Sequence, residues 1–327
     1  MKQFMKKSIQ LSNYLILVCL LVGGAFAAEK PKDNFSKSYS PSVNQSHSTR
    51  VYWGDTHLHT NVSADGSGIG NSLSPDEAYR FAKGETVIAP NGMKVRLRRP
   101  LDFLVMADHA VNMGVLSRAY EADPILRKTE AGQFWYDLIK DNPQLKSWDT
   151  YMAKDFTTSQ LFTSIARLFH PNDMTGIKSN DPLRFVNDIV FRRSVWEEVT
   201  AKADCYNNPG LFTALIGYEW TPSQIEGKGQ GYGNFHRVVL FKDSAEKTRQ
   251  ILPFSRLDSQ DPEDLWAFLD DYEHRTGGEA MAIPHNGNAT RGAMFALTDL
   301  KDRPLSKQYA LLRSRWEPIL EVTQMKG

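Results

Sequence analysis

Short apolar runs separated by polar stretches make up most of the chain beyond about residue 50. They are rich in β-branched, aliphatic and aromatic residues and have the length of strands. The runs span residues 50–54, 101–109, 211–219, 233–241, 279–286 and 318–324. Residues 74–84 and 262–277 are predicted helices, and Ser74, Pro75 and Glu77 provide the start signal of the first one. Strands interleaved with helices predict an α/β fold with a largely parallel sheet.

Residues 112–204 differ in character from the rest of the chain. Segments such as FWYDLIKD and FVNDIVFRRSVWEEV carry apolar residues at three- and four-residue spacing, and no run in this stretch has the character of a strand. Two interpretations are open. The stretch is either a mostly helical insertion that walls a pocket, or a set of ordinary packing helices of the main domain.

The first residues have the anatomy of an export signal. Residues 1–27 combine a lysine-containing start, an apolar run at 15–22 and small residues up to Ala27, after which we expect cleavage. The apolar run is short for a membrane span, so we expect a periplasmic or secreted protein without a stable membrane anchor. Residues 28–49, rich in Lys, Ser, Pro and Asn, read as a flexible leader, and residues 50–327 as one domain.

Composition narrows the class of protein. The 327 residues are 41% hydrophobic, which suffices for a sizeable core. Lys and Arg number 39 against 38 Asp and Glu, a net charge of +1, so no global field recruits nucleic acid. Once the signal is removed, Cys205 has no cysteine to pair with, and we expect it to be a buried small apolar residue. The sequence contains neither a G-x-S-x-G motif nor a Walker-type phosphate loop.

Potential metal ligands lie at or near the ends of most apolar runs. His57 and His59 follow the first run, and alternate residues of an extended segment share a face. Asp65 comes six residues after His59, and Asp108 and His109 end the second run.

The later runs continue this pattern. Glu219 ends the third run, His236 lies within the fourth, His285 ends the fifth and Glu321 lies in the last. The carboxyl ends of parallel strands open onto one rim, so these residues could converge there. Imidazoles and carboxylates without thiolates suit zinc, manganese or iron, and their number suggests two or three divalent ions that activate a water. The other histidines, His47, His170 and His274, are expected to be structural or exposed.

The ordered motifs WGDTHLHT, VMADHAVNMG, IGYEW and IPHN resemble the polymerase and histidinol phosphatase (PHP) superfamily, and most closely the bacterial domain-of-unknown-function 3604 family. The resemblance covers residues 51–327 and implies a distorted (β/α)7 barrel with a trinuclear site. It implies a role for each motif residue: His57 and His59 bind the first ion, Glu219 bridges the first and second, His236 and His285 complete the second, and Asp65 and His109 bind the third. Asp108 would orient His109 or a neighbour.

One departure from the family pattern affects both fold and function. PHP proteins usually end with a D-x-H element on the last strand, and none follows His285 here. We therefore expect a barrel that is incomplete at its C-terminus, a truncated product, and reduced ion binding.

The resulting prediction is a metal-dependent hydrolase, a phosphoesterase in reaction type, that acts on a small anionic ester. Besides the metal ligands, we expect Asp108 to contribute to catalysis by orienting a neighbour, and Arg291, six residues beyond His285, to contact the substrate. The alternative is an exported metal-binding or interaction protein without turnover, because the terminal ligands are absent. A nucleic-acid enzyme is disfavoured by the balanced charge and the export signal.

Overall fold

The computed structural model describes residues 49–68, 70–141, 185–222, 235–290 and 292–322. The chain divides into two compact units, Met1–Val51 and Tyr52–Gly327. Of the first unit only residues 49–51 are described, and they carry no helix or strand. The predicted signal and almost all of the predicted leader therefore lie outside the described residues. Within the described residues, no helix combines the length and apolar character needed to cross a membrane.

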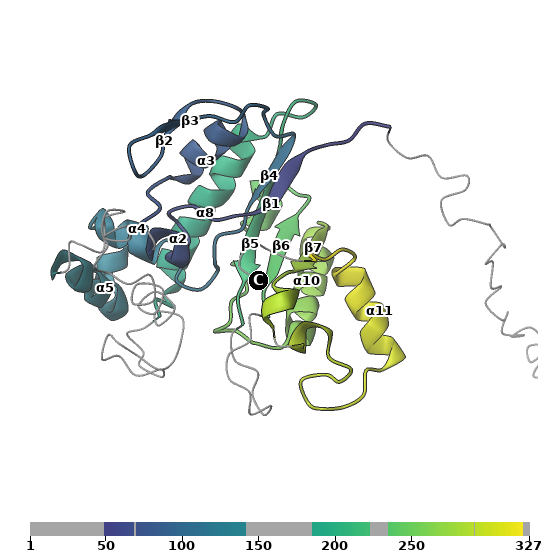
Figure 1. Cartoon of the computed structure of the whole chain (residues 1–327). Coiled ribbons are helices and arrows are strands. Elements are labelled where there is room, and N and C mark those ends of the chain that lie inside the picture. Colours follow the sequence, from purple (N-terminus) through teal and green to yellow (C-terminus); the bar gives the residue numbers. More distant parts are fainter. Residues whose placement is uncertain (1–48, 69, 142–184, 223–234, 291, 323–327) are drawn as a thin grey trace, which may run out of the picture. The chain divides into compact units, whose positions relative to one another are not determined.

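A curled five-stranded sheet forms the centre of the second unit (Figure 1). Its strands lie in the order β1 (Gly54–Leu58), β4 (Phe103–Met106), β5 (Thr213–Trp220), β6 (Arg237–Phe241) and β7 (Ala280–Pro284). β1, β4 and β5 are parallel, whereas β6 is antiparallel to both of its neighbours. The predicted α/β class is confirmed as a mixed α/β half-barrel. The expectation of a largely parallel sheet needs correction at β6, and the distorted (β/α)7 barrel, incomplete at its C-terminus, stays a prediction.

Helices cover one face of this sheet. α3 (Pro75–Ala82) packs against β4, α8 (Ile189–Tyr206) against β5, and α10 (Pro262–Thr276) and α11 (Lys307–Trp316) against β7. The remaining described elements are α2 (Ala64–Gly68), the hairpin β2 (Val87–Ile88) and β3 (Lys94–Val95), α4 (Val115–Tyr120), η1 (Leu126–Lys128), α5 (Glu130–Asp141), α9 (Ala245–Thr248), η4 (Gly287–Ala289) and η5 (Ala293–Phe295).

The start signal of α3 works as predicted. The Ser74 hydroxyl accepts a hydrogen bond from the Glu77 backbone N–H at 3.4 Å, and the Ser74 N–H donates to the Glu77 carboxylate at 2.9 Å. This reciprocal pair satisfies backbone donors that the first helical turn leaves open. With Pro75 at the first position, the helix begins at the predicted residue.

Two predicted strands differ from the observed structure. The first strand is Gly54–Leu58 rather than 50–54, because it is Gly54 and Asp55 that pair with Phe103 and Leu104 of β4. The last predicted strand, 318–324, is described to residue 322 and carries no regular strand there. It nevertheless runs beside the end of β7, since the Glu321 N–H donates to the Pro284 carbonyl at 3.0 Å.

The described part of residues 112–204 is helical and contributes to the main core. Trp135 and Ile139 of α5 and Val195 and Trp196 of α8 belong to the same buried cluster as the sheet residues that face the helices. These helices therefore pack as parts of the domain itself. Residues 142–184 lie outside the described residues, so the pocket-wall interpretation stays a prediction.

The opposite face of the sheet carries a smaller apolar cluster. Val105, Ala107, Val238 and Ile283 are buried there, while Leu104 and Met106 face the helices, as the two-residue period of a strand requires. Position 217 on this face is a glycine. A Cβ there would come within 2.5 Å of the Val105 side chain. Space on this face is thus limited. Toward one rim of the sheet, the side chains on the same face become polar.

Candidate metal centre

The polar rim follows from the strand alternation. His109 continues the series of Val105 and Ala107, and His285 follows two residues after Ile283. Glu219 lies within β5, two residues after Gly217. Backbone hydrogen bonds extend the ladders to this edge: the Glu219 N–H donates to the Asp108 carbonyl at 3.0 Å, and the His285 N–H to the His236 carbonyl at 3.2 Å.

His236 reaches the same rim for a different reason. It comes directly before β6 rather than within it, which corrects the sequence interpretation. Because β6 runs opposite to β5 and β7, its starting end lies at the edge where its neighbours finish. A parallel fourth strand would have placed its first residues at the other edge.

Glu219 is the centre of the arrangement. Its carboxylate is 1% exposed and lies among five imidazoles. One oxygen, Oε2, lies 3.2 Å from His57 Nε2, 2.7 Å from His59 Nε2 and 3.5 Å from His109 Nδ1. The other, Oε1, lies 2.6 Å from His236 Nδ1 and 2.9 Å from His285 Nε2. The two oxygens therefore face two different sets of nitrogen atoms.

Asp65 forms a second point of convergence. Its carboxylate lies 2.9 Å from His59 Nδ1 and 3.3 Å from His109 Nε2. The Ser63 hydroxyl and the Gly66 N–H donate to the same carboxylate, at 2.5 and 2.6 Å. The Asp65 side chain is 35% exposed, so this group lies at the open side of the site.

Nitrogen and oxygen atoms meet in overlapping sets of three, the arrangement that metal ions require. The sets are His57, His59 and Glu219; Glu219, His236 and His285; His59, Asp65 and His109; and His57, His285 and Glu321. Each set brings its atoms within 4.8 Å of one another. The buried histidine and carboxylate groups could therefore hold metal ions.

A test of this fit is the environment of His59. Its Nε2 lies 2.7 Å from Glu219 Oε2, yet this buried atom has no partner with hydrogen-bond geometry among the described residues. A buried polar atom without such a bond costs free energy. A buried nitrogen that lies so close to a buried carboxylate oxygen without hydrogen-bond geometry fits a position between the two for a cation, and nitrogen and oxygen donors suit zinc, manganese or iron.

The charges of the cluster are strongly coupled. Desolvation raises the pKa of Glu219, but His109, His285 and His236 outweigh it and hold this pKa well below the usual range. Desolvation likewise raises the pKa of Asp65, while His59 and His109 bring it well below normal. Burial lowers the pKa of His59, but Asp65 and Glu219 hold it well above the usual value. Both carboxylates are therefore ionised at neutral pH.

His236 and His285 have the opposite balance. Burial lowers the pKa of His236 to about 3, although Glu219 opposes the change. Burial also lowers the pKa of His285. Because neutral imidazole is the form that binds metal ions, these two side chains are ready ligands at neutral pH.

Further residues support the ligands without a signal in the sequence analysis. Thr221, two residues after Glu219, contacts His109 Nδ1 through its hydroxyl. Asn286 has φ 65°, is buried, and its Nδ2 lies 3.2 Å from His236 Nδ1. Its amide therefore faces one of the candidate ligands. The signal in the sequence that could have identified both residues is a polar side chain one or two positions after a ligand at a strand end.

Other predicted residues lie elsewhere. Arg291 is outside the described residues, so its predicted contact with substrate stays a prediction. His274 is exposed on α10, as expected. Cys205 is exposed near the end of α8, so the expectation that it is buried is wrong. It occupies a solvent-facing position of a helix whose apolar side packs on the sheet.

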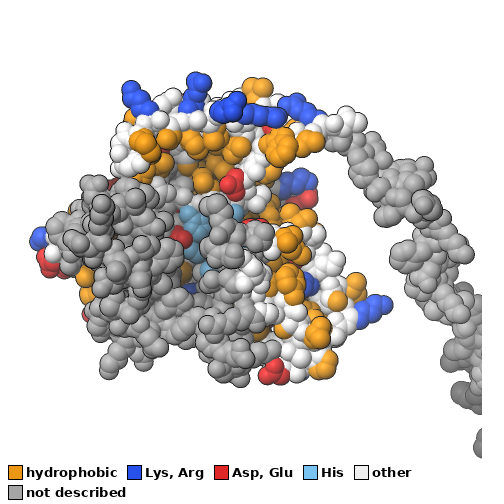
Figure 2. Space-filling model, viewed as in Figure 1, with side chains coloured by type: hydrophobic (Ala, Val, Ile, Leu, Met, Phe, Trp, Pro, Cys, Tyr) orange, Lys and Arg blue, Asp and Glu red, His pale blue; other side chains and the backbone are white. Residues whose placement is uncertain are grey.

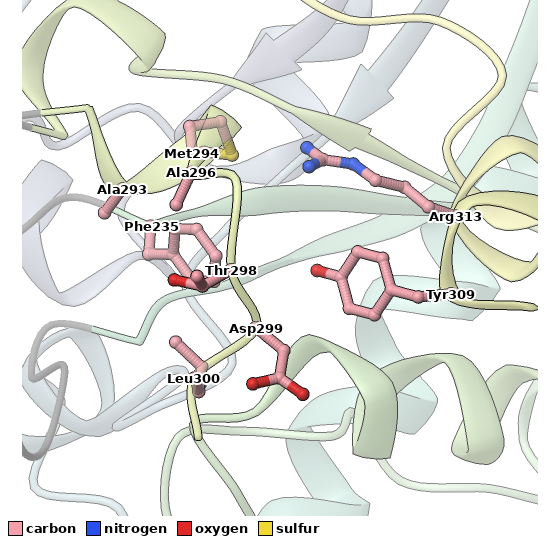
Figure 3. Close-up of a pocket in the computed structure, with 9 residues that line it drawn as sticks. All are labelled: Phe235, Ala293, Met294, Ala296, Thr298, Asp299, Leu300, Tyr309 and Arg313. Carbon is pink, nitrogen blue, oxygen red and sulfur yellow. The ribbon is translucent and has the colours of Figure 1, made fainter. Parts of the chain in front are cut away.

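The cluster reaches the molecular surface. Figure 2 shows histidine side chains on this face with acidic side chains beside them. A separate pocket lies along the chain segments next to His236 and His285. Figure 3 shows Tyr309 and Arg313 of α11 directed into it, with Phe235 and Met294 among the other residues that line it. None of the residues in the metal-binding sets lines this pocket.

The fold and the site together define a class of protein: a mixed α/β domain with a cluster of histidines and carboxylates at one rim of its sheet. The chain belongs to the family described as "Protein of unknown function (DUF3604)", whose model matches residues 46–327. No curated protein and no solved structure matches the chain. The resemblance to the 3604 family is confirmed, and membership of the PHP superfamily stays a proposal.

Proposed function

We propose that this chain is a metal-dependent hydrolase of the PHP type that cleaves a phosphoester of a small anionic molecule. The observation that supports it best is the buried Glu219 carboxylate among five imidazoles, with each oxygen directed at its own group of nitrogen atoms. A buried charge is costly unless it is paired, and all five partners here are side chains that can bind metal ions. The phosphoester class itself rests on the resemblance to PHP proteins, which is an argument by analogy.

The residues divide into three groups in this proposal. His57 and His59 would bind one ion, His236 and His285 a second, and Asp65 and His109 a third, with Glu219 shared between the first two. Bound divalent ions would supply an activated water and stabilise negative charge that develops on the substrate oxygens.

The chain itself prepares this chemistry. Neutral His236 and His285 need not lose a proton before they bind metal. The partly exposed Asp65 marks the side from which a substrate would enter. Asp108 supports the site by holding Thr60, beside His59, and Arg291 is our candidate for contact with the anionic substrate. Export of the protein, with no stable membrane anchor after cleavage of residues 1–27, completes the proposal.

The test compares the full chain with Glu219→Gln. Bound zinc, manganese and iron are measured by mass spectrometry, and hydrolysis is assayed with a phosphomonoester, a phosphodiester, a carboxylic ester and an amide after loading with each metal. We expect the wild-type chain to bind at least two ions and to cleave a phosphoester. The Glu219→Gln variant should lose most of its metal and its turnover.

His274→Ala is the matched control, since the His274 side chain is 78% exposed and belongs to none of the metal-binding sets. It should retain metal and activity. Tight metal binding without hydrolysis of any of the four substrates would favour the alternative, an exported metal-binding protein without turnover. Absence of metal binding by the wild-type chain would reject both.

A further inference from the structure

We propose that Glu321 is a positioning residue that fixes the orientation and the tautomer of His57. Glu321 Oε2 lies 3.4 Å from His57 Nδ1, while His57 Nε2 lies 3.2 Å from Glu219 Oε2. The two nitrogen atoms of an imidazole point away from each other, so one ring bridges two carboxylates. This inference rests on the proposed metal centre and assigns a function to a residue for which the sequence analysis found none.

Glu321 is brought to this position by a segment with two anchors. Its own N–H donates to the Pro284 carbonyl at the end of β7, at 3.0 Å. Four residues earlier, the Glu317 side chain, 1% exposed, accepts from Arg237 Nε and Trp266 Nε1, both at 3.0 Å. The segment is thus fixed to β6, β7 and α10 before it reaches His57 of β1.

This anchoring explains how Glu321 can be effective although its side chain is 30% exposed. An exposed carboxylate on a free chain would lose side-chain entropy to hold one geometry. Here the chain is held at the Glu317 side chain and at the Glu321 N–H, so little beyond the Glu321 side chain itself must be ordered. Residues 319, 320 and 322 are exposed apolar residues, which leaves Glu321 as the described residue of this stretch that turns toward the site.

The chemical consequence concerns where His57 carries its proton. A neutral imidazole has one N–H, and with an ion held on the Nε2 side that proton would lie on Nδ1, where Glu321 accepts it. Nε2 then keeps its lone pair toward Glu219, where a metal ion would be bound. Metal-binding histidines generally donate their other N–H to such a partner, and loss of the partner weakens metal affinity by about 10–100-fold.

The test uses Glu321→Ala and Glu321→Gln in the full chain, with His274→Ala as the control. Zinc affinity is measured by competition with a chelator, and the tautomer of His57 by nitrogen-15 NMR of the zinc-loaded protein. We expect Glu321→Ala to bind zinc about 10–100-fold more weakly and to lose the preference of His57 for the Nδ1–H tautomer. Glu321→Gln should recover most of both properties, because the amide oxygen accepts the same hydrogen bond.

Two results would overturn the proposal. One is a Glu321→Ala variant with wild-type zinc affinity and an unchanged His57 tautomer. The other is the loss of one whole equivalent of zinc in both variants, which would make Glu321 a direct ligand. Neither readout depends on turnover, so a chain that binds zinc and hydrolyses nothing would reject the hydrolase proposal and leave this one to be decided on its own data.

Discussion

The Asp108 carboxylate accepts two hydrogen bonds from Thr60, from the backbone N–H at 2.6 Å and from the hydroxyl at 2.8 Å. Both residues are almost completely buried. The pair joins the segment after β4 to the segment after β1, and Thr60 directly follows His59. From the sequence we expect Asp108 to orient either His109 or a neighbour. The two hydrogen bonds from Thr60 fit the second possibility, because Thr60 lies next to the candidate ligand His59.

Replacement of Asp108 by Ala should destabilise the protein and weaken metal binding. The change leaves the buried Thr60 N–H without an acceptor, a loss of about 1–3 kcal/mol in the free energy of unfolding. Chemical denaturation in the presence of a chelator measures this loss without the contribution of metal. Thr60→Ser keeps the hydroxyl group and should remain within about 1 kcal/mol of wild type. Equal stability of Asp108→Ala and wild type would contradict the assigned role.

The buried ion pair of Arg237 and Glu317 gives a second prediction. Their side chains are 0% and 1% exposed, and Glu317 also accepts from Trp266 and Arg313. Glu317→Ala leaves Arg237 buried without its partner and should cost about 3–5 kcal/mol of unfolding free energy, measured by denaturant titration.

Two comparisons sharpen this prediction. The double variant Arg237→Met, Glu317→Leu removes both charges and should be more stable than Glu317→Ala alone. Glu279→Ala breaks the exposed pair with Lys242, whose side chain is 71% exposed, and should cost less than about 1 kcal/mol. A cost for Glu317→Ala as small as that for Glu279→Ala would show that the buried network does not anchor the segment.

The stability of the metal-free protein should depend on the protonation of His236. Its pKa is about 3 in the folded protein against an ordinary value of 6.5, so below pH 6.5 the unfolded chain binds a proton that the folded chain does not. This contribution to stability is complete above pH 6.5 and is lost as the pH falls toward 3, by about 1.4 kcal/mol per pH unit.

Denaturation in a chelator at pH 7, 6 and 5 tests this pH dependence with His236→Gln as the comparison. The unfolding free energy of the variant should fall less steeply on acidification, and the difference in slope should correspond to the uptake of about one proton. His59 contributes in the opposite direction because its pKa is raised, but it is present in both proteins and cancels from the difference. Parallel pH profiles of the two proteins would contradict the low pKa of His236.

Cys205 should react with thiol reagents in the folded protein. It is an exposed residue near the end of α8, so a reagent reaches it without unfolding. Wild-type protein should take up one more equivalent of a chromogenic disulfide than Cys205→Ser under native conditions, and at a rate close to that in denaturant. Uptake only after unfolding would mean that the thiol is protected.

Several features of the site could be read from sequence because they depend on local periodicity. His57 and His59 share a face since they are alternate residues of a nearly extended segment, and both reach Glu219 Oε2. His109 and Glu219 were recognisable as polar ends of apolar runs, and the structure brings their side chains together. The capping signal at Ser74 was equally local and gave the start of α3 correctly.

Chain direction and pairing were not local properties. Nothing in the residues of β6 distinguishes a parallel from an antiparallel neighbour, so the antiparallel path that brings His236 to the rim emerged only in the folded sheet. The bounds of β1 were also decided by its partner strand, because β1 begins at the residue whose backbone first pairs with β4 through hydrogen bonds. The exposure of Cys205 depended in the same way on which side of α8 packs inward.

The sequence by itself determined which segments are helices, most of the strands, the alternation along them and the kinds of ligand at the strand ends, since these follow from the chemistry of neighbouring residues. The tertiary structure alone decided that Glu219 lies between all five imidazoles and that Glu321 reaches His57 from a segment 264 residues away. These contacts depend on the curl of the sheet and on the buried Glu317 side chain, which holds together segments that are far apart in the sequence.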